Sequence, residues 1–442
     1  KDRSSSMDSK ELKETCLKHT MYSWGKRSAV DPLPITRTEG VYMYTPEGKK
    51  ILDFNSQLMS VNIGHGHPKV VQAMKDAADG VTYVFPGTAT EPRAKLSKKL
   101  AGLMPESINT FFFTLGGADA NENAIRMARL YSGKQKILAR YRSYHGGTNL
   151  CIALTGDPRR WGNEPGPNGI VHFFDPQPYF FSFGATEEER TEKSLLMLDE
   201  QIQYEGASTI AAIIIETVTG TNGILPPPKN YLTGLRALCD KYGILLICDE
   251  VMAGFCRTGK MFAFEHFGIV PDLVTVAKGL TASYVPLGAV CVSDKIAKHF
   301  DDHVFWGGLT YNAHAFCCEV ACAVIDVYVD EKMADKAVKM GAVMRGHMER
   351  MQAKHKCVKA FRQIGLFGMM DLQNAEGELI CGYNGSHPAM GALGKHFKEQ
   401  GLFTFVRWSH FMCNPPLIIS EEEMAEAWEI IDAGLTIVDG MI

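Results

Sequence analysis

The stretch "DEVMAGFCRTGKMFAFEHFGIVPDLVTVAKGL", residues 249–280, carries the strongest information about how this chain folds. Its last part, "DLVTVAKGL" (272–280), is an apolar run typical of a buried strand, yet it contains Lys278. An unpaired ammonium in a protein core costs several kcal/mol or loses its proton. The lysine must therefore leave the core where the strand ends, or be present in order to react.

Similar apolar runs continue on both sides of this stretch, between about residues 75 and 330, and they alternate with helical patterns. The runs are "NTFFFTLGG", "KILARY", "IAAIIIETV", "GILLICDEV", "DLVTVAKG" and "PLGAVCVS". Continuous apolar runs separated by amphipathic helices indicate strands that are buried on both faces. The sequence therefore predicts an α/β fold with a mostly parallel sheet, whose ligands bind at the carboxyl ends of the strands.

The two flanks of this region have a different pattern. Residues 39–54 predict a β-hairpin around a Pro-Glu-Gly turn, and the chain from about residue 332 alternates helices with short strands. We therefore expect an N-terminal segment (1–75) and a C-terminal segment (331–442) to form a small α+β domain on the large domain (76–330).

Two further segments have a distinctive composition. Residues 155–185 are rich in Pro, Gly and aromatic residues, and a loop of this length is expected to be an active-site wall or a mobile lid. Residues 1–6 precede Met7 and are interpreted as an artificial remnant outside the fold.

Composition and charge argue against several classes of function. The 46 Lys and Arg residues against 50 Asp and Glu residues give a net charge of -4, without the long basic stretch of a nucleic-acid-binding protein. No segment has the length of a membrane span, and the polar N-terminus lacks a hydrophobic signal core, so a cytoplasmic enzyme is expected. Twelve scattered cysteines are expected to be reduced. Because "CCEVAC" is the nearest approach to a ligand cluster and no CxxC pair occurs, no metal site is expected.

Polar residues end two of the apolar runs. Asp249 follows "GILLIC", and Lys278 follows "DLVTVA" at a corresponding position in the next run. Carboxyl ends of parallel strands meet at one edge of a sheet, so these two side chains are expected to lie close together. They could form a simple salt bridge, or they could hold opposite ends of one cofactor.

Three further motifs contribute residues of the kinds that a phosphorylated cofactor needs. Gly117 begins a helix after a strand, where backbone N–H groups can bind an anion. Tyr144 and His145 follow "KILAR", and Thr310 lies in "WGGLTYNAH". Each motif alone is equally consistent with a tight turn or ordinary packing. Together with an acid and a lysine, they fit pyridoxal 5'-phosphate (PLP), a planar, phosphorylated aldehyde.

The order of these motifs resembles the class III aminotransferases of PLP fold type I, from about Trp24 to the C-terminus. The most specific part is the stretch quoted first, which is similar to the family's DEV, GF, RTG, PD and KG pattern. The segments "LGGADANENAIRMAR", "YHGGT", "IIIETVTGTNGILPPP", "TYNAH" and "NPPLII" follow the family's order. The resemblance implies the PLP-dependent transferase fold, with a mostly parallel seven-stranded sheet between helices and a small α+β domain from the terminal segments.

The resemblance also implies roles for individual residues. Lys278 would form an imine with the cofactor and then act as general base and acid, and Asp249 would pair with the pyridinium nitrogen. The other implied cofactor contacts are Gly117 and Ala118 on the phosphate, Tyr144 and Val251 on the two ring faces, His145 and Glu216 near the ring, and Thr310 on the phosphate of the neighbouring subunit. The active enzyme is therefore expected to be a homodimer with shared active sites, with a tetramer as the alternative.

Three positions depart from the family's usual pattern. Ala118 stands where many members have a serine in the phosphate turn, and Met252 stands where ornithine- and GABA-type members have a glutamine. Thr221 stands where those members have a glutamate that pairs with the gate arginine. An ornithine- or GABA-type enzyme that uses 2-oxoglutarate is therefore disfavoured.

The resemblance is closest to the ω-amino acid:pyruvate branch, and "TFVRWSHFMCNPPLII" is similar to the taurine–pyruvate type. It implies amino transfer from an ω-amino acid of the taurine or β-alanine type to pyruvate, with Arg407 as the anchor for a carboxylate or sulfonate. An interdomain ion pair is the alternative role for Arg407. Met59, Phe85 and Trp161 are candidate pocket walls, although each is equally consistent with packing. The alternative functions are another class III reaction, such as that of an aminomutase, racemase or decarboxylase, and a catalytically silent binding protein.

Overall fold

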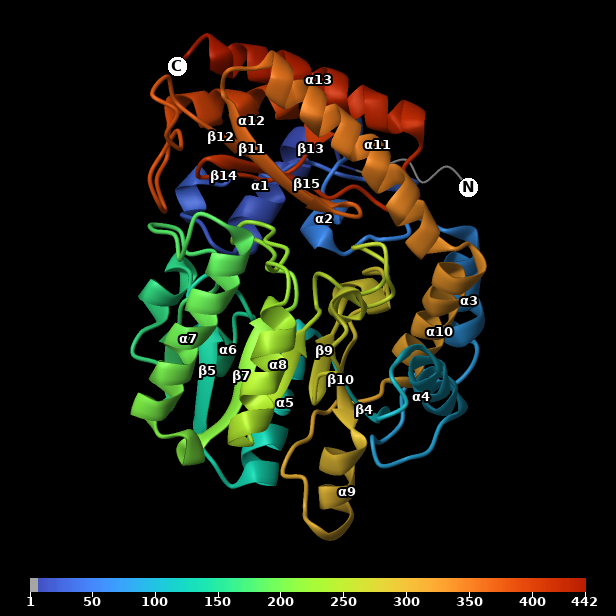
Figure 1. Cartoon of the computed structure of the whole chain (residues 1–442). Coiled ribbons are helices and arrows are strands. Elements are labelled where there is room, and N and C mark those ends of the chain that lie inside the picture. The colour runs from blue at the N-terminus through green and yellow to red at the C-terminus, as the bar shows by residue number, and fades with distance from the viewer. Residues whose placement is uncertain (1–6) are drawn as a thin grey trace.

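A seven-stranded sheet forms the centre of the large part of the molecule (Figure 1). The computed structural model describes residues 7–442, so the interpretation of residues 1–6 lies outside the described residues. In spatial order the strands are β4 (Ile108–Thr114), β10 (Gly288–Ser293), β9 (Leu273–Val276), β8 (Leu245–Asp249), β7 (Ile210–Glu216), β5 (Lys136–Arg140) and β6 (Ile170–Phe173). β10 runs in the opposite direction to the other six strands, and it pairs in an antiparallel manner with β4 and β9. The predicted mostly parallel α/β fold is confirmed.

Both faces of this sheet are covered by helices. On β7, Ile214 packs on one face in a cluster with Ile125 of α5 (Gly117–Ser132). Its neighbour Ile213 belongs to the cluster on the other face, which includes Leu235 of α8 (Tyr231–Tyr242). Successive side chains of a strand point to opposite faces, so a strand covered on both sides must be apolar throughout. The unbroken run "IAAIII" has this property.

The remaining helices near the large sheet include α7 (Glu187–Glu205), which packs beside α8 on the same face. The others are α3 (Pro68–Ala78), α4 (Glu91–Leu103), α6 (Asn149–Leu154), α9 (Asp294–Asp302) and α10 (Ala315–Asp330). The cysteines of "CCEVAC" are buried on α10, and residues 7–442 contain no cluster of three or more His, Cys, Asp or Glu side chains arranged to hold a metal. Within the same residues, no helix has both the length and the apolar character needed to cross a membrane.

The small part of the molecule combines the two ends of the chain. One sheet joins β1 (Arg37–Glu39), β2 (Tyr42–Tyr44) and β3 (Lys50–Asp53) to β13 (Leu402–Phe403), and β2 and β3 form the predicted hairpin. A second sheet contains β11 (Val358–Ile364), β12 (Phe367–Leu372), β15 (His410–Cys413) and β14 (Val406–Arg407). The associated helices are α1 (Ser9–His19), α2 (Ser56–Met59), α11 (Met333–Lys354), α12 (Pro388–Gln400) and α13 (Glu421–Asp439). In Figure 1 this part lies against the end of the large sheet where α2 is labelled.

The segment 155–185 is more ordered than its composition suggested. It contains a 3₁₀ turn, Pro158–Asn163, and the edge strand β6, which pairs in parallel with β5. The interpretation of the whole segment as an irregular loop was therefore wrong at β6. This strand has only four residues and one hydrogen-bonded neighbour, so it lacks the long buried apolar run that marks the inner strands.

Candidate active site

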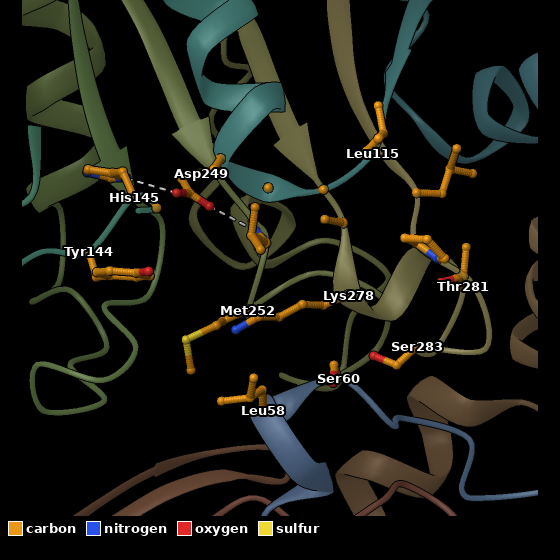
Figure 2. Close-up of a pocket in the computed structure, with 18 of the residues that line it drawn as sticks. Leu58, Ser60, Leu115, Tyr144, His145, Asp249, Met252, Lys278, Thr281 and Ser283 are labelled. Atoms are coloured by element: carbon orange, nitrogen blue, oxygen red, sulfur yellow. Dashed lines mark hydrogen bonds and ion pairs between the residues drawn. The ribbon is translucent and has the colours of Figure 1, made fainter. Parts of the chain in front are cut away.

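A cavity of about 510 Å³ lies at the carboxyl ends of β7, β8 and β9 (Figure 2). Strand ends, the start of α5, the segment after β5 and the segment around α2 all contribute to its wall. Its lining includes Glu216, Asp249, Val251, Met252, Lys278, Gly116, Gly117, Ala118, Tyr144, His145, Leu58 and Ser60. The small part of the molecule therefore closes the site that the large sheet builds.

Lys278 lies in a 3₁₀ turn, Lys278–Leu280, immediately beyond the end of β9. Its backbone φ is 43°, in the left-handed region that is unfavourable for a residue with a side chain. Its side chain reaches the cavity and stays partly accessible there. Burial lowers the pKa of its ammonium to about 8, although Asp249 and Glu216 act in the opposite direction. The lysine thus leaves the core at the strand end, and its lowered pKa makes the neutral, reactive amine more accessible than in an ordinary lysine.

Asp249 is fixed at the end of β8 by three donors. His145 Nδ1 lies 2.8 Å from Asp249 Oδ2, Asn121 Nδ2 donates to the same oxygen at 2.9 Å, and the backbone N–H of Val251 donates to Oδ1 at 2.9 Å. Asn121 in turn accepts a hydrogen bond of 2.6 Å from Thr275 Oγ1. Three hydrogen-bond donors fix the direction of this carboxylate. Figure 2 shows Asp249 between His145 and the cavity.

The glycine-rich turn before α5 forms another wall. Asp119 accepts hydrogen bonds from the backbone N–H groups of Leu115 and Gly116, which fixes the start of the helix. The amides of Gly117 and Ala118 follow, in the first turn, where a helix offers no backbone acceptor. A Cβ atom on Gly117 would lie 2.9 Å from Val251 Cγ1, so the turn and Val251 are in close contact. This geometry suits an anion next to a flat ring.

Tyr144 and Glu216 form the side of the cavity beside β7. Glu216 Oε1 accepts from the backbone N–H of Tyr144 at 2.8 Å, and Oε2 accepts from the N–H of Gly220 at 2.7 Å. Burial raises the pKa of Glu216 to about 7, against the nearby charge of His145. Glu216 therefore connects the loop that contains Tyr144 to the loop that contains Gly220 at the edge of the cavity. The Tyr144 ring lies along one wall (Figure 2).

Arg407 follows Val406 in β14, and it contacts the loop after β7. Its Nη1 donates to the carbonyl of Thr221 at 3.0 Å, and its Nη2 lies 3.5 Å from Asp157 Oδ2. Burial lowers the pKa of the Arg407 guanidinium, and the charge of Asp157 opposes this shift. Arg407 therefore has a carboxylate partner in Asp157, although position 221 is a threonine. Asp157 was not among the residues that the sequence singled out.

Five predicted site residues lie outside the lining of this cavity, and Arg407, described above, is one of them. Met59 is buried in a cluster that includes Met252 and Val218. Phe85 is 74% exposed, and Trp161 borders a neighbouring cavity. The backbone carbonyl of Thr310 accepts from the hydroxyl of Tyr83 at 2.7 Å, away from the cavity of its own chain. Their predicted contacts with substrate, or with the cofactor of a second subunit, stay predictions.

The site also contains residues that the sequence did not indicate. Asn121 is fully buried in the second turn of α5, and an amide among the mostly apolar buried residues of this helix was a signal that could have identified it. Asp157 and Arg159 carry no such signal, because they lie in the segment 155–185 and their importance comes from contacts with distant loops.

The arrangement fits a planar cofactor with an anionic tail. The start of α5 offers backbone N–H groups, Asp249 faces the cavity as a fixed carboxylate, and Lys278 supplies an amine with a lowered pKa. His145 Nε2 is buried without a hydrogen-bond partner, and it lies in the same wall. A buried polar atom without a partner is uncommon in a folded protein, and a bound group can supply the missing contact.

Comparison with known proteins agrees with this fit to a planar, phosphorylated cofactor. The family model for aminotransferase class-III matches residues 24–435. Putrescine–pyruvate aminotransferase of Pseudomonas aeruginosa is 32% identical over 413 residues, which cover 89% of this chain and 88% of that protein. Gamma-aminobutyrate transaminase 1, mitochondrial, of Oryza sativa subsp. japonica is 32% identical over 90% of this chain and 80% of its own length.

Solved structures are similar over almost the whole chain. Taurine:2-oxoglutarate aminotransferase from Bifidobacterium kashiwanohense, in complex with PLP and glutamate, superimposes with a TM-score of 0.95 at 40% identity and covers 99% of both chains. An (S)-enantioselective omega-transaminase from Thermomicrobium roseum has a TM-score of 0.92 at 35% identity, over 98% of this chain and 100% of that one. With its sheet, its lysine and its carboxylate arranged as described, the chain belongs to the class III aminotransferases, which depend on PLP.

Proposed function

We propose that this aminotransferase takes the amino group of an ω-amino acid of the taurine or β-alanine type and transfers it to pyruvate, which forms L-alanine. The observation that carries the proposal is the position of Arg407. This guanidinium is largely buried and lies outside the cavity lining, to which Asp157, Arg159 and Tyr144 connect it. Asp157 is its carboxylate partner only at 3.5 Å, so a further anion can bind to it. The carboxylate or sulfonate of an ω-amino acid supplies that anion at the far end of the molecule from its amine.

In the proposed reaction, residues from each wall of the cavity have a distinct role. The bound cofactor supplies an aldehyde for the donor amine and a ring that takes up electrons. Lys278 would move the proton that leaves the substrate carbon. Asp249, held by His145 and Asn121, would keep a proton on the ring nitrogen, and Tyr144 and Val251 would contact the ring. Gly117 and Ala118 would hold the phosphate through their backbone N–H groups.

The proposal includes a homodimer in which Thr310 reaches the phosphate bound by the neighbouring subunit. Thr310 lies away from the cavity of its own chain, and the surrounding surface is apolar. Two segments of the chain adjoin here, because Tyr83 contacts Thr310 and Tyr311. Both segments carry exposed large apolar side chains, namely Val81, Tyr83, Val84, Phe85, Val304, Trp306 and Tyr311. A patch of this kind supports a protein interface.

A panel of donors and acceptors tests the proposed function. Taurine, β-alanine and hypotaurine are each incubated with pyruvate or 2-oxoglutarate, and the alanine or glutamate formed is measured. The proposal expects alanine, with one of these donors preferred to an amine without an acid group. An isomerised donor, without any need for an acceptor, would instead indicate an aminomutase or racemase.

A second candidate is the same reaction with 2-oxoglutarate as the acceptor, and glutamate as the product. The absence of a glutamate at position 221 argued against it, but Asp157 provides Arg407 with a carboxylate from another loop. The 40% identity to a taurine:2-oxoglutarate aminotransferase also supports this acceptor. The panel separates the two candidates, because pyruvate yields alanine and 2-oxoglutarate yields glutamate.

The substitution Ala118→Ser is expected to tighten cofactor binding. The added hydroxyl would stand at the start of α5 beside the phosphate, and a hydrogen bond to a charged acceptor contributes about 1.5 to 3 kcal/mol. The dissociation constant of PLP from the apoenzyme should therefore fall by about tenfold or more. Titration of the apoenzyme, followed by absorbance, measures the change.

The matched control is Ala185→Ser, which places the same hydroxyl on an exposed loop away from the cavity. It should leave the dissociation constant of PLP at the wild-type value. An unchanged constant in the Ala118→Ser variant would mean that the phosphate does not bind at this turn.

A further inference from the structure

A second cavity, of about 390 Å³, lies at the carboxyl ends of β5 and β6. Tyr141 and Arg142 follow β5 in the chain, Phe174 and Asp175 follow β6, and all of them line the cavity. Among residues 7–442, none lines both this cavity and the catalytic one. Small-molecule sites have volumes of this order, and they often lie at the carboxyl ends of parallel strands. The proposed aminotransferase reaction does not use this cavity.

Aromatic rings form most of the wall of the second cavity. The centroid of the Phe174 ring lies 5.2 Å from that of Tyr141 and 5.3 Å from that of Phe181. The ring of Tyr383 lies 5.1 Å from that of Tyr179. Tyr141 and Phe181 are 40% and 45% exposed, so their rings are not covered by the rest of the chain. Because aromatic rings stack on one another favourably, the cavity favours a ligand with a flat ring.

Arg142 brings a positive charge to the same wall. Its Nε and Nη2 donate to the backbone carbonyl of Asn222 at 3.1 and 2.6 Å, and its Nη1 donates to that of Gln177 at 2.8 Å. Burial lowers the pKa of its guanidinium, although the charge of Asp175 acts in the opposite direction. These bonds use three of the five N–H groups of a guanidinium, and all three acceptors are uncharged. An enclosed guanidinium of this kind favours an anion.

Asp175 has an unused acceptor. Its Oδ1 accepts from the backbone N–H of Gln177 at 2.9 Å, whereas its Oδ2 is buried without a hydrogen-bond partner. The residue is only 2% exposed, and burial without a donor is unfavourable for a carboxylate oxygen. The hydroxyl of Tyr179, another lining residue, is also buried without a partner. A ligand with N–H donors can supply the missing contacts.

We propose that this second cavity binds a free amino acid with an aromatic side chain. The carboxylate of the ligand would bind Arg142, its ammonium would bind Asp175, and its ring would stack on the aromatic wall. This inference goes beyond the proposed function, because the ligand is neither the amino donor nor the acceptor and does not meet the cofactor.

The charges of the cavity favour a ligand that carries both signs. Arg160, the other lining arginine, is paired with Glu164, so Arg142 and Asp175 are the charges left for a ligand. An aromatic acid without an amine would place a second negative charge beside Asp175. An aromatic amine without an acid would place a second positive charge beside Arg142. Like charges at contact distance are unfavourable, and the zwitterion avoids both cases.

The test measures binding to the PLP-loaded enzyme after reduction with borohydride, so that the amine of the ligand cannot react with the cofactor. Equilibrium dialysis with labelled L-phenylalanine gives the dissociation constant and the number of molecules bound per chain. Competition with 3-phenylpropionate, phenethylamine and L-alanine then removes the ammonium, the carboxylate and the ring in turn. We expect one molecule of L-phenylalanine per chain, and binding at least about tenfold weaker for each of the three partial ligands.

Two variants locate the binding in this cavity. Asp175→Asn keeps the shape of the side chain and should raise the dissociation constant of L-phenylalanine by about tenfold, as expected for loss of a charge-assisted contact. In the same variant 3-phenylpropionate should bind at least as tightly as in the wild type, because a like charge has been removed. Phe180→Ala removes a lining ring that is 77% exposed, so folding should not suffer. It should weaken L-phenylalanine by about threefold to tenfold.

Matched substitutions on exposed helix surfaces serve as controls. Asp240→Asn on α8 and Tyr204→Ala on α7 change side chains that are 65% and 83% exposed and lie outside the cavity lining. Both should bind L-phenylalanine as the wild type does. Thermal unfolding shows whether each variant is folded, and Phe180→Ala still tests the site if Asp175→Asn is not.

Several results would overturn the inference. The first is the absence of L-phenylalanine binding, and the second is equal binding of L-phenylalanine and 3-phenylpropionate by the wild type. A loss of both ligands in Asp175→Asn would assign Asp175 a structural role instead. Wild-type affinity in both Asp175→Asn and Phe180→Ala would place the bound amino acid elsewhere, such as in the catalytic cavity. None of these measurements requires turnover, so the proposed function stands or fails separately.

Discussion

The variant Lys278→Ala should lose nearly all aminotransferase activity, with kcat reduced by at least about 10³-fold. General acid–base catalysis by one positioned side chain contributes roughly 10² to 10⁴ in rate, and this residue also carries the covalent attachment of the cofactor. Lys278 lies beyond the end of β9 with its pKa lowered to about 8, so a larger fraction of its amine is neutral near pH 7 than in an ordinary lysine. Single-turnover rates of alanine or glutamate formation measure the loss.

Reduction with borohydride identifies the attachment point independently of turnover. In the wild-type enzyme it should add the mass of the cofactor to the peptide that contains Lys278, and in the variant it should not. Lys260→Ala is the control, because Lys260 is exposed on a neighbouring loop and should leave both rate and labelling unchanged. Labelling of another lysine in the wild type would show that Lys278 has been assigned the wrong role.

The variant Asp249→Asn should bind the cofactor but react about 10² to 10³ times more slowly, the range found when one preorganised electrostatic contact is removed. The amide cannot balance a positive charge on the ring nitrogen, so the ring gives up its proton and takes up electrons less readily. His145 and Asn121 would still hold the new side chain in place through its carbonyl oxygen. Measurement of kcat, together with the dissociation constant of PLP, separates this chemical effect from a loss of binding.

The same change in an exposed carboxylate provides the comparison for Asp249. Asp240 pairs with Arg236 on α8, its side chain is 65% exposed, and Asp240→Asn should retain the wild-type rate. A wild-type rate for Asp249→Asn as well would contradict the assignment of Asp249 to the ring nitrogen. A thermal unfolding curve close to that of the wild type would show that either variant is folded.

The inner strands of the sheet could be predicted from the sequence because a strand that is buried on both faces is apolar at consecutive positions. β7, β8 and β9 appear as unbroken apolar runs, and each polar residue that ends a run lies at the cavity. Asp249 and Lys278 were predicted by this reasoning. The short edge strand β6 was missed, since one neighbour and partial burial do not impose such a run.

The contacts around these residues could not be predicted in the same way. Asn121 reaches Asp249 from 128 positions away, and Arg407 approaches Asp157 from 250 positions away. An interdomain ion pair was left open as the alternative role of Arg407, but the sequence did not name its partner, and the fold supplies Asp157 from another loop. A single sequence contains no local signal for which polar side chains of separate loops will meet.

By itself, the sequence determined the parallel sheet, the glycine-rich helix start, and the lysine and carboxylate at the strand ends. These features depend on hydrophobic periodicity and on local backbone preference, which are properties of neighbouring residues. Only the tertiary structure decided how Asp249 is held, and that Arg159 and Arg407 converge on one carboxylate. Those contacts depend on how distant segments pack against each other, because charges interact through space rather than along the chain.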